Sequence, residues 1–331
     1  METYVAPRTL QRGRGLKELW RSLVGLQEAA MIIPVVGVTL YFYSLNPIML
    51  SPVTVRSVLY TIAYPGLAAV GLALLMIVGE IDLSTGPVMG FCAVSAAWLM
   101  RVGGWPAWAG MAGGILLALA VGLVNGVLTV KLGAPSLVVT LAVGVTIRGV
   151  GYLLTQGGPI SHLPLEAGAV GNLRVGGLSV ALILMLVMLA VVQIMLSLTR
   201  WGAAAYATGG NKLAAQQCGI NTDRVKIAAF MLTSLLAGIA GMLIMCQLIS
   251  GDPIIGRGQE LNIITGVIVG GISFFGGRGS AINAVLGILL IQIVLTGLIL
   301  IHVDSSWHVL VMGIILAGAA ALDARRRRRQ G

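Results

Sequence analysis

Ten apolar segments follow one another along this chain, and they constrain its fold more than any other feature. A helix needs about 20 apolar residues to cross the hydrocarbon core of a bilayer. Only 10% of the 331 residues are charged, against roughly 25% in soluble domains. The sequence therefore predicts an all-α, polytopic integral membrane protein with about ten transmembrane helices. The expected spans are 30–45, 56–79, 84–101, 106–130, 135–155, 176–198, 226–249, 260–276, 281–301 and 307–323.

Two of these segments, 84–101 and 260–276, differ from the other eight. Both are short and rich in glycine, and both adjoin polar residues. Transporters build binding sites from helices that are interrupted inside the membrane. We therefore expect broken or re-entrant helices at these two places.

The distribution of basic residues predicts the orientation of the chain, because Lys and Arg accumulate in cytoplasmic loops. With ten spans and an inner N-terminus, sixteen of the 21 Lys and Arg residues lie on the inner side, four on the outer side, and Arg148 within a span. Both termini are therefore predicted to be cytoplasmic. The four outer residues are Arg56, Arg101, Arg174 and Arg257.

The chain divides into three parts on this reading. Residues 1–29 form a cytoplasmic basic segment, in which apolar residues from Leu16 to Val24 recur at helical spacing. That spacing favours an interfacial amphipathic helix, with a disordered leader as the alternative. Residues 30–323 form the transmembrane domain. The Arg-rich tail at 324–331 is typical of a topology anchor on anionic lipid; a nucleic-acid tail is the alternative, and we expect no nucleic-acid partner.

A polar cluster at 79–86 separates the second and third spans, and it includes Glu80, Asp82 and Ser84. Ionisable residues near a bilayer interior are costly, so they are functional candidates. Asp82 or Ser84 is suited to cap the next helix by accepting its free amides. The same groups are suited to hydrogen-bond a polyhydroxylated solute along a transport pathway, and both interpretations stay open here.

The longest predicted inner loop spans 199–226. Within it, Asn211 is placed to cap a short helix over 212–217, and Gly219 to end it in a left-handed conformation. A helix this short is unstable alone, so we expect it to dock in a groove on a partner. A plain surface loop is the alternative.

Glycines recur around Glu260 in the last third of the chain and predict close helix packing and a tight inner turn. Glu260 is expected to cap an apolar run or to pair with Arg257. No phosphate-binding loop, metal-ligand spacing or nucleophile–base pair accompanies these residues, so the sequence supports neither a metal site nor an enzymatic role. A structural or gating role is expected for Arg148, Glu260, Gly270, Gly271, Gly276 and Gly277.

Four motifs, in this order, resemble the permease subunits of ATP-binding-cassette (ABC) importers for monosaccharides, the ribose/xylose/galactose class. The resemblance extends from about Val53 to Asp323. Each motif alone is weakly specific, but four in register identify the family. They are the Gly-x-Ile-Asp-Leu-Ser run at 79–84, the Pro-x-x-x-x-Thr-Leu…Arg-Gly stretch at 135–149, the Tyr-Ala-x-Gly-Gly-Asn-x-x-Ala-Ala pattern within 199–220, and the glycine block at 258–279.

The resemblance implies a multi-pass permease in the bacterial inner (plasma) membrane. It implies an ABC ATP-binding subunit that uses ATP and Mg, a periplasmic sugar-binding protein, and a second permease subunit that forms a homo- or heterodimer. No cofactor is expected on this chain itself. The residues expected to couple it to the ATP-binding subunit are Gly209, Gly210, Asn211, Lys212, Ala214, Ala215 and Gly219.

Glu80 departs from the family, which has glycine at this position. We expect the added carboxylate to alter solute preference or to raise a pKa in the Glu80–Asp82 pair by like-charge repulsion. The solute stays open, because related permeases import rhamnose or autoinducer-2. Permeases for branched-chain amino acids and a stand-alone ion-coupled secondary carrier are the alternatives.

Overall fold

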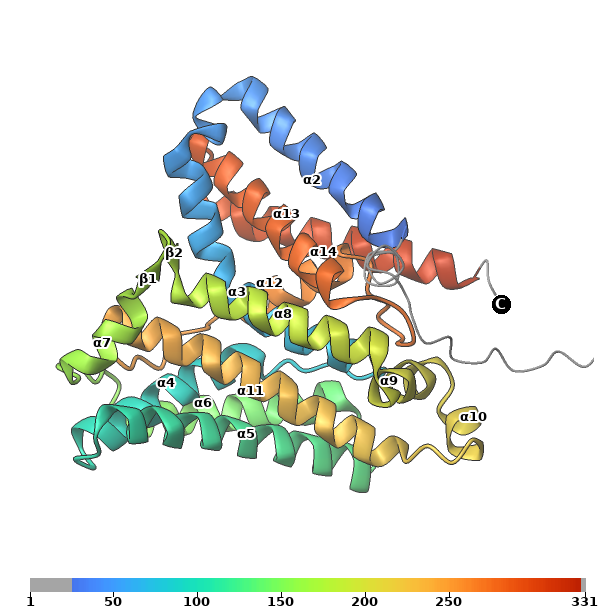
Figure 1. The fold of residues 1–331 in the computed structure, drawn as a ribbon, viewed down its shortest axis with the longest axis horizontal. Helices are drawn as coiled ribbons and strands as arrows, with labels where there is room; N and C mark the ends of the chain where they lie inside the picture. The colour runs from blue at the N-terminus through green and yellow to red at the C-terminus, as the bar shows by residue number, and fades with distance from the viewer. Residues whose placement is uncertain (1–25, 329–331) are drawn as a thin grey trace, which may run out of the picture.

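The computed structural model describes residues 26–328, and most of this stretch is helical (Figure 1). A two-stranded antiparallel hairpin pairs Arg174 with Ser179 and Val175 with Leu178. The longer helices are α2 (Leu26–Leu45), α3 (Pro52–Ile77), α4 (Thr85–Arg101), α5 (Ala107–Lys131), α6 (Ser136–Thr155), α8 (Val180–Leu198), α11 (Thr222–Leu248), α13 (Ala281–Leu300) and α14 (Ser305–Arg328). The shorter elements are η1 (Pro47–Leu50), α7 (Leu165–Asn172), β1 (Arg174–Val175), β2 (Leu178–Ser179), α9 (Arg200–Gly210), α10 (Lys212–Gln217) and α12 (Gln259–Val269).

Each of the ten predicted segments coincides with one of these helices. Six of them, α3, α5, α6, α8, α11 and α13, are long and apolar enough to cross a membrane. The chain is therefore a polytopic helical membrane protein, while a count of ten spans stays a prediction. The expected interfacial helix at 16–24 lies outside the described residues.

Several predicted boundaries are wrong, and local chemistry explains the differences. α3 begins at Pro52 rather than 56, because Ser51 accepts a hydrogen bond from the Thr54 amide and Pro52 suits the first turn. The span expected from 176 starts with the β1–β2 hairpin, so α8 begins only at Val180. The 199–226 segment is mainly helix rather than loop, and α14 continues past 323 to Arg328.

Buried helices form the centre of the molecule. α3 is the most buried of the six long apolar helices, and α11 follows it; α11 packs against α3, α4 and α5. In α5, α6 and α8 only 28–33% of the apolar window is buried, as expected of helices that face lipid. In Figure 1, α2 and α13 lie along the upper edge, α5 along the lower edge, and α8 and α11 between them.

The segment predicted as a span at 260–276 is helical only to Val269, as α12 (Gln259–Val269), and a non-helical stretch precedes it. Residues 251–258 run as non-helical chain along α4, where Gly251 packs beside Ala97 and Gly256 beside Gly86. Eleven helical residues separate those two positions on α4, a depth of about 16 Å. α12 then adds 11 residues, or about 16 Å more. Together they cover the roughly 30 Å of a bilayer core. A broken crossing is therefore present, but its coil lies before the predicted bounds of 260–276, and the expected break at 84–101 is wrong because that segment holds one uninterrupted helix.

Two groups of short elements lie at opposite ends of the molecule. α9 and α10 lie at the right of Figure 1, together with the start of α2 and the end of α14. α7 and the β1–β2 hairpin lie at the left. The arrangement places both ends of the described chain on one side; which side faces the cytoplasm stays a prediction from the charge distribution.

Candidate functional site: a coupling surface and a central cavity

Glycines from three distant motifs meet at the end that carries α9 and α10. A Cβ atom on Gly209 would overlap the carbonyl oxygen of Ile77 at the end of α3. The Gly277 amide donates a hydrogen bond to that same oxygen over 2.9 Å. Gly276, with φ of +87°, lies directly against Gly79. We call this set the glycine junction: Gly79, Gly209, Gly210, Gly276 and Gly277.

Two further glycines of the same block shape the chain next to the junction. A Cβ atom on Gly270 would overlap the carbonyl oxygen of Asn283 on α13. Gly271 has a φ of +89° and allows the chain to turn after α12 ends at Val269. The sequence prediction of close helix packing and a tight turn is therefore confirmed here.

The short helix α10 forms as the sequence predicts. The side chain of Asn211 accepts a hydrogen bond from the Ala214 amide over 3.0 Å, and Gly219 has a φ of +80°. Ala215 is buried against the protein, while Lys212, Leu213 and Ala214 are exposed. Leu213 is 72% exposed, an unusual position for a large apolar side chain outside lipid. The helix and its cap are confirmed, and its role in coupling stays a prediction.

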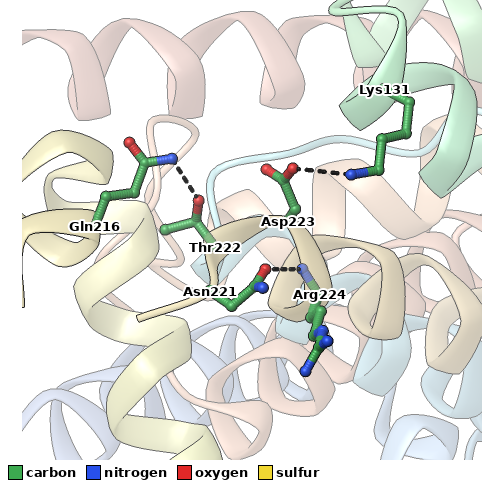
Figure 2. Close-up of polar contacts among 6 residues, drawn as sticks. All are labelled: Lys131, Gln216, Asn221, Thr222, Asp223 and Arg224. Carbon is green, nitrogen blue, oxygen red and sulfur yellow. Dashed lines mark hydrogen bonds and ion pairs between the residues drawn. The ribbon is translucent and has the colours of Figure 1, made fainter. Parts of the chain in front are cut away.

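α10 is tied to the long helix α11 by hydrogen bonds that Figure 2 shows. The Gln216 side chain donates to the Thr222 hydroxyl over 3.0 Å, and Asn221 caps α11 by accepting from the Arg224 amide. Asp223 in the first turn of α11 pairs with Lys131 at the end of α5 over 3.4 Å. The start of α11 is thus fixed both to α10 and to α5.

Glu80 joins this end of the molecule rather than the Asp82 site. Its carboxylate forms an ion pair with Lys226 on α11, and both side chains are only 13% exposed. The expectation that Glu80 and Asp82 act as a carboxylate pair is wrong, because each faces a different set of partners.

Asp82 and Ser84 are fully buried, but neither caps α4 in the expected way. One Asp82 oxygen accepts from the Ser84 amide over 2.6 Å and from the Ser84 hydroxyl over 2.5 Å. Ser84 in turn accepts from the amide of Asn125 on α5 over 2.8 Å. Thr140 on α6 accepts from the Leu83 amide. This network fixes the turn between α3 and α4 against α5 and α6, and a role in the solute pathway stays a prediction.

Arg148 and Glu260 approach each other deep between α6 and α12. Their nearest charged atoms are 4.0 Å apart, and the side chains are 19% and 24% exposed. The expected pairing of Glu260 with Arg257 is wrong, and no side chain caps α12 at Gly258. Gly86 on α4 leaves the space that the Glu260 carboxylate occupies. The gating role assigned to Arg148 and Glu260 stays a prediction.

A cavity of about 240 Å³ lies beside the broken segment, between α3, α12 and α13. Apolar side chains such as Met89, Ile244 and Leu295 form part of its wall. No charged residue of the described chain lines it. Its polar lining consists of neutral side chains, namely Thr61, Tyr64, Gln259, Asn262 and Gln292.

No sequence motif contains the full set of residues that line this cavity. Thr61, Asn262 and Gln292 are single polar residues within apolar helices, and nothing in the sequence places them together. Their one shared signal is an amide or hydroxyl inside a predicted span, where unpaired polar groups are costly. Asp82, Ser84 and Glu80, the predicted pathway residues, do not line the cavity.

Comparison with known proteins places the chain in a family. Residues 54–320 match the family described as "Branched-chain amino acid transport system / permease component". The chain belongs to this family, and it is an ABC-type permease rather than a soluble subunit.

Curated relatives resemble it over most of their length. The probable ABC transporter permease protein YphD of Escherichia coli is 34% identical over 89% of this chain and 88% of its own. The ribose import permease protein RbsC of Bacillus subtilis is 33% identical over 85% and 88%. The autoinducer 2 import system permease protein LsrC of Yersinia pseudotuberculosis is 34% identical over 79% and 74%. No solved structure matches the chain.

Proposed function

We propose that this protein is the membrane-spanning permease subunit of an ABC importer that moves a monosaccharide or similar polyhydroxylated solute into a bacterial cell. ATP hydrolysis occurs in a separate ATP-binding subunit, which uses Mg. A periplasmic binding protein delivers the solute, and a second permease subunit completes the pore in the inner membrane. The relatives named for ribose and autoinducer 2 import support this solute class.

The exposed face of α10 is the observation that carries the proposal. Leu213 and Ala214 present apolar surface at the end of the molecule opposite the β1–β2 hairpin. A helix of six residues gains stability by docking, and the ATP-binding subunit fits this role. Because Gln216 ties α10 to Thr222, movement of the docked helix passes directly into α11. Binding and hydrolysis of ATP then shift the population between inward- and outward-facing states.

The two alternatives receive less support. An ion-coupled secondary carrier would need titratable groups along the pathway, yet Glu80 pairs with Lys226 and the cavity lining is neutral. A permease for branched-chain amino acids fits the family description. It would have to accommodate the ammonium and carboxylate of its solute, and the cavity offers no charged partner to either.

Co-purification of partner subunits tests the proposal. The tagged full chain, extracted in mild detergent, is expected to bring down an ATP-binding subunit with ATPase activity. Ala214→Asp places a charge on the exposed face of α10 and should abolish this association while the chain stays folded. Leu173→Asp places the same charge on another exposed residue, between α7 and β1 at the opposite end, and should leave the association intact. A chain that purifies alone and without ATPase activity would contradict the proposal.

Ala214 is the better position for this test than its neighbour. Ala215 is 4% exposed and packs against the chain itself. Substitution with Arg at 215 would therefore disturb folding as well as docking, and the two effects would not be separable.

A further inference from the structure

The cavity lies near the middle of two long helices, α3 and α13. Tyr64 is near the midpoint of α3, and Gln292 is near the midpoint of α13. The third wall is the start of α12, which begins after the coil at 251–258 that runs along α4. Transporters commonly bind their solute near the bilayer midplane, at the ends of interrupted helices.

Two of its polar side chains have no partner among the described residues, whereas the Gln292 amide donates a long hydrogen bond of 3.4 Å to Thr296, one turn away on α13. The side-chain amides of Gln259 and Asn262 hydrogen-bond to no other residue between 26 and 328. Unpaired polar groups inside a membrane protein cost free energy. Each amide offers a donor and an acceptor, so the missing partner is a group that both accepts and donates. Hydroxyl groups have this property.

The end of α12 adds donors to the same wall. No side chain caps its first turn, which starts at Gln259 and therefore holds backbone amides without a side-chain acceptor. The rest of the wall is apolar and suits the C–H faces of a ring. At about 240 Å³ the cavity is smaller than the roughly 300–1,000 Å³ of sites for drug-sized ligands.

We propose that the solute binds in transit inside this single chain, in the cavity between α3, α12 and α13, with Asn262, Gln259 and Gln292 hydrogen-bonding its hydroxyl groups. The site takes a neutral polyhydroxylated solute of monosaccharide size. This inference rests on the proposed function, and it adds a location and a set of contacts within one subunit. The carboxylates at 80 and 82 are not part of this site.

Uptake by variants of the reconstituted complex tests the site. The complex co-purified with its ATP-binding subunit and binding protein is placed in proteoliposomes, with radiolabelled ribose, xylose, galactose and leucine as probes. Asn262→Leu removes the amide at similar volume and should lower sugar uptake about tenfold or more. Asn262→Gln keeps an amide and should retain most of the uptake. ATPase stimulation by the binding protein should persist in both.

Two further variants make the result specific. Gln292→Met removes an amide from a different helix and decides the question if Asn262→Leu fails to assemble. Asn172→Leu is the matched control, because this asparagine bonds only locally, to the Gly168 carbonyl on α7. It should transport sugar like the unmodified chain.

Failure of the proposed site and failure of the proposed function give different results in these experiments. Uptake by Asn262→Leu and Gln292→Met equal to that of Asn172→Leu, with ATPase activity intact, would overturn the site and leave the importer standing. Uptake of leucine, or of none of the three sugars, by the unmodified complex would overturn the solute class. Failure to co-purify any ATP-binding subunit would instead overturn the importer assignment itself.

Discussion

The glycine junction and the central cavity are built from the same helices in opposite ways. α3 carries Tyr64 at the cavity and ends at Ile77 in the junction, while α11 carries Ile244 at the cavity and Lys226 beside the junction. At the junction, backbone atoms touch and the nearby charges are paired. At the cavity, space is left open, and the amides of Gln259 and Asn262 lack partners among the described residues.

This difference predicts separate roles in transmission of movement and in recognition. Backbone packed against backbone leaves no space to compress, so we expect α3, α9 and the turn after α12 to move together at the junction. α11, a helix of 27 residues, runs from this end to the cavity. Open space and unpaired amides at the cavity leave room for a solute to enter and leave. Variants at the junction and at the two ion pairs of α11 test how tightly this end of the molecule is packed.

The largest effect is expected at Gly209. Gly209→Ala would force a Cβ atom into the Ile77 carbonyl, and only backbone movement relieves that overlap. We expect the free energy of unfolding to fall by about 3 kcal/mol, the upper end of the range for overpacking. The measurement is unfolding in mixed micelles of mild detergent and SDS. Gly210→Ala is the matched control, because a Cβ atom there meets nothing within 4 Å. Equal stability of the two variants would contradict the close packing of the junction.

A smaller effect is expected at the ion pair between Glu80 and Lys226. Glu80→Gln leaves Lys226 largely buried without its carboxylate, and it should cost about 1.5–3 kcal/mol, as for hydrogen bonds to charged groups. The same unfolding assay measures this loss. The exchange Glu80→Lys with Lys226→Glu should recover part of the stability. If the double variant loses the sum of the two single losses, the pair does not couple α11 to the junction.

The smallest effect is expected at the second ion pair on α11. Lys131 and Asp223 are 62% and 36% exposed, and exposed pairs contribute about 0.2–1 kcal/mol. Lys131→Gln should therefore lower stability only slightly, and less at high salt because exposed charges are screened. Titration of the unfolding midpoint against NaCl measures this dependence. A loss as large as that of Glu80→Gln would show that burial does not distinguish the two pairs.

Local chemistry allowed the short helix α10 to be predicted from the sequence. Asn211 and Gly219 determine the start and end of α10 through their own side chain and backbone, so the helix appears where the sequence predicts it. The assignment as a membrane protein follows from long apolar segments, whose exposure to water would be unfavourable. The glycine motifs predict close packing, although they do not state which segments meet.

Contacts between distant residues were decided by the tertiary structure alone. Glu80 stands two residues from Asp82, yet its partner is Lys226 at the start of α11. The chain at 251–258, just before α12, packs as coil along α4 because Gly86 and Gly90 leave space for it.

The sequence by itself thus determined the membrane class, the family motifs and the capped helix α10, because hydropathy and capping depend on residues close together in the chain. The tertiary structure decided the ion pairs, the glycine junction and the cavity. Asn262 and Gln292 lie on different helices, and only the packing of α12 against α13 brings their amides to one cavity. Side-chain type fixes what a residue is able to bind, whereas long-range packing fixes what it meets.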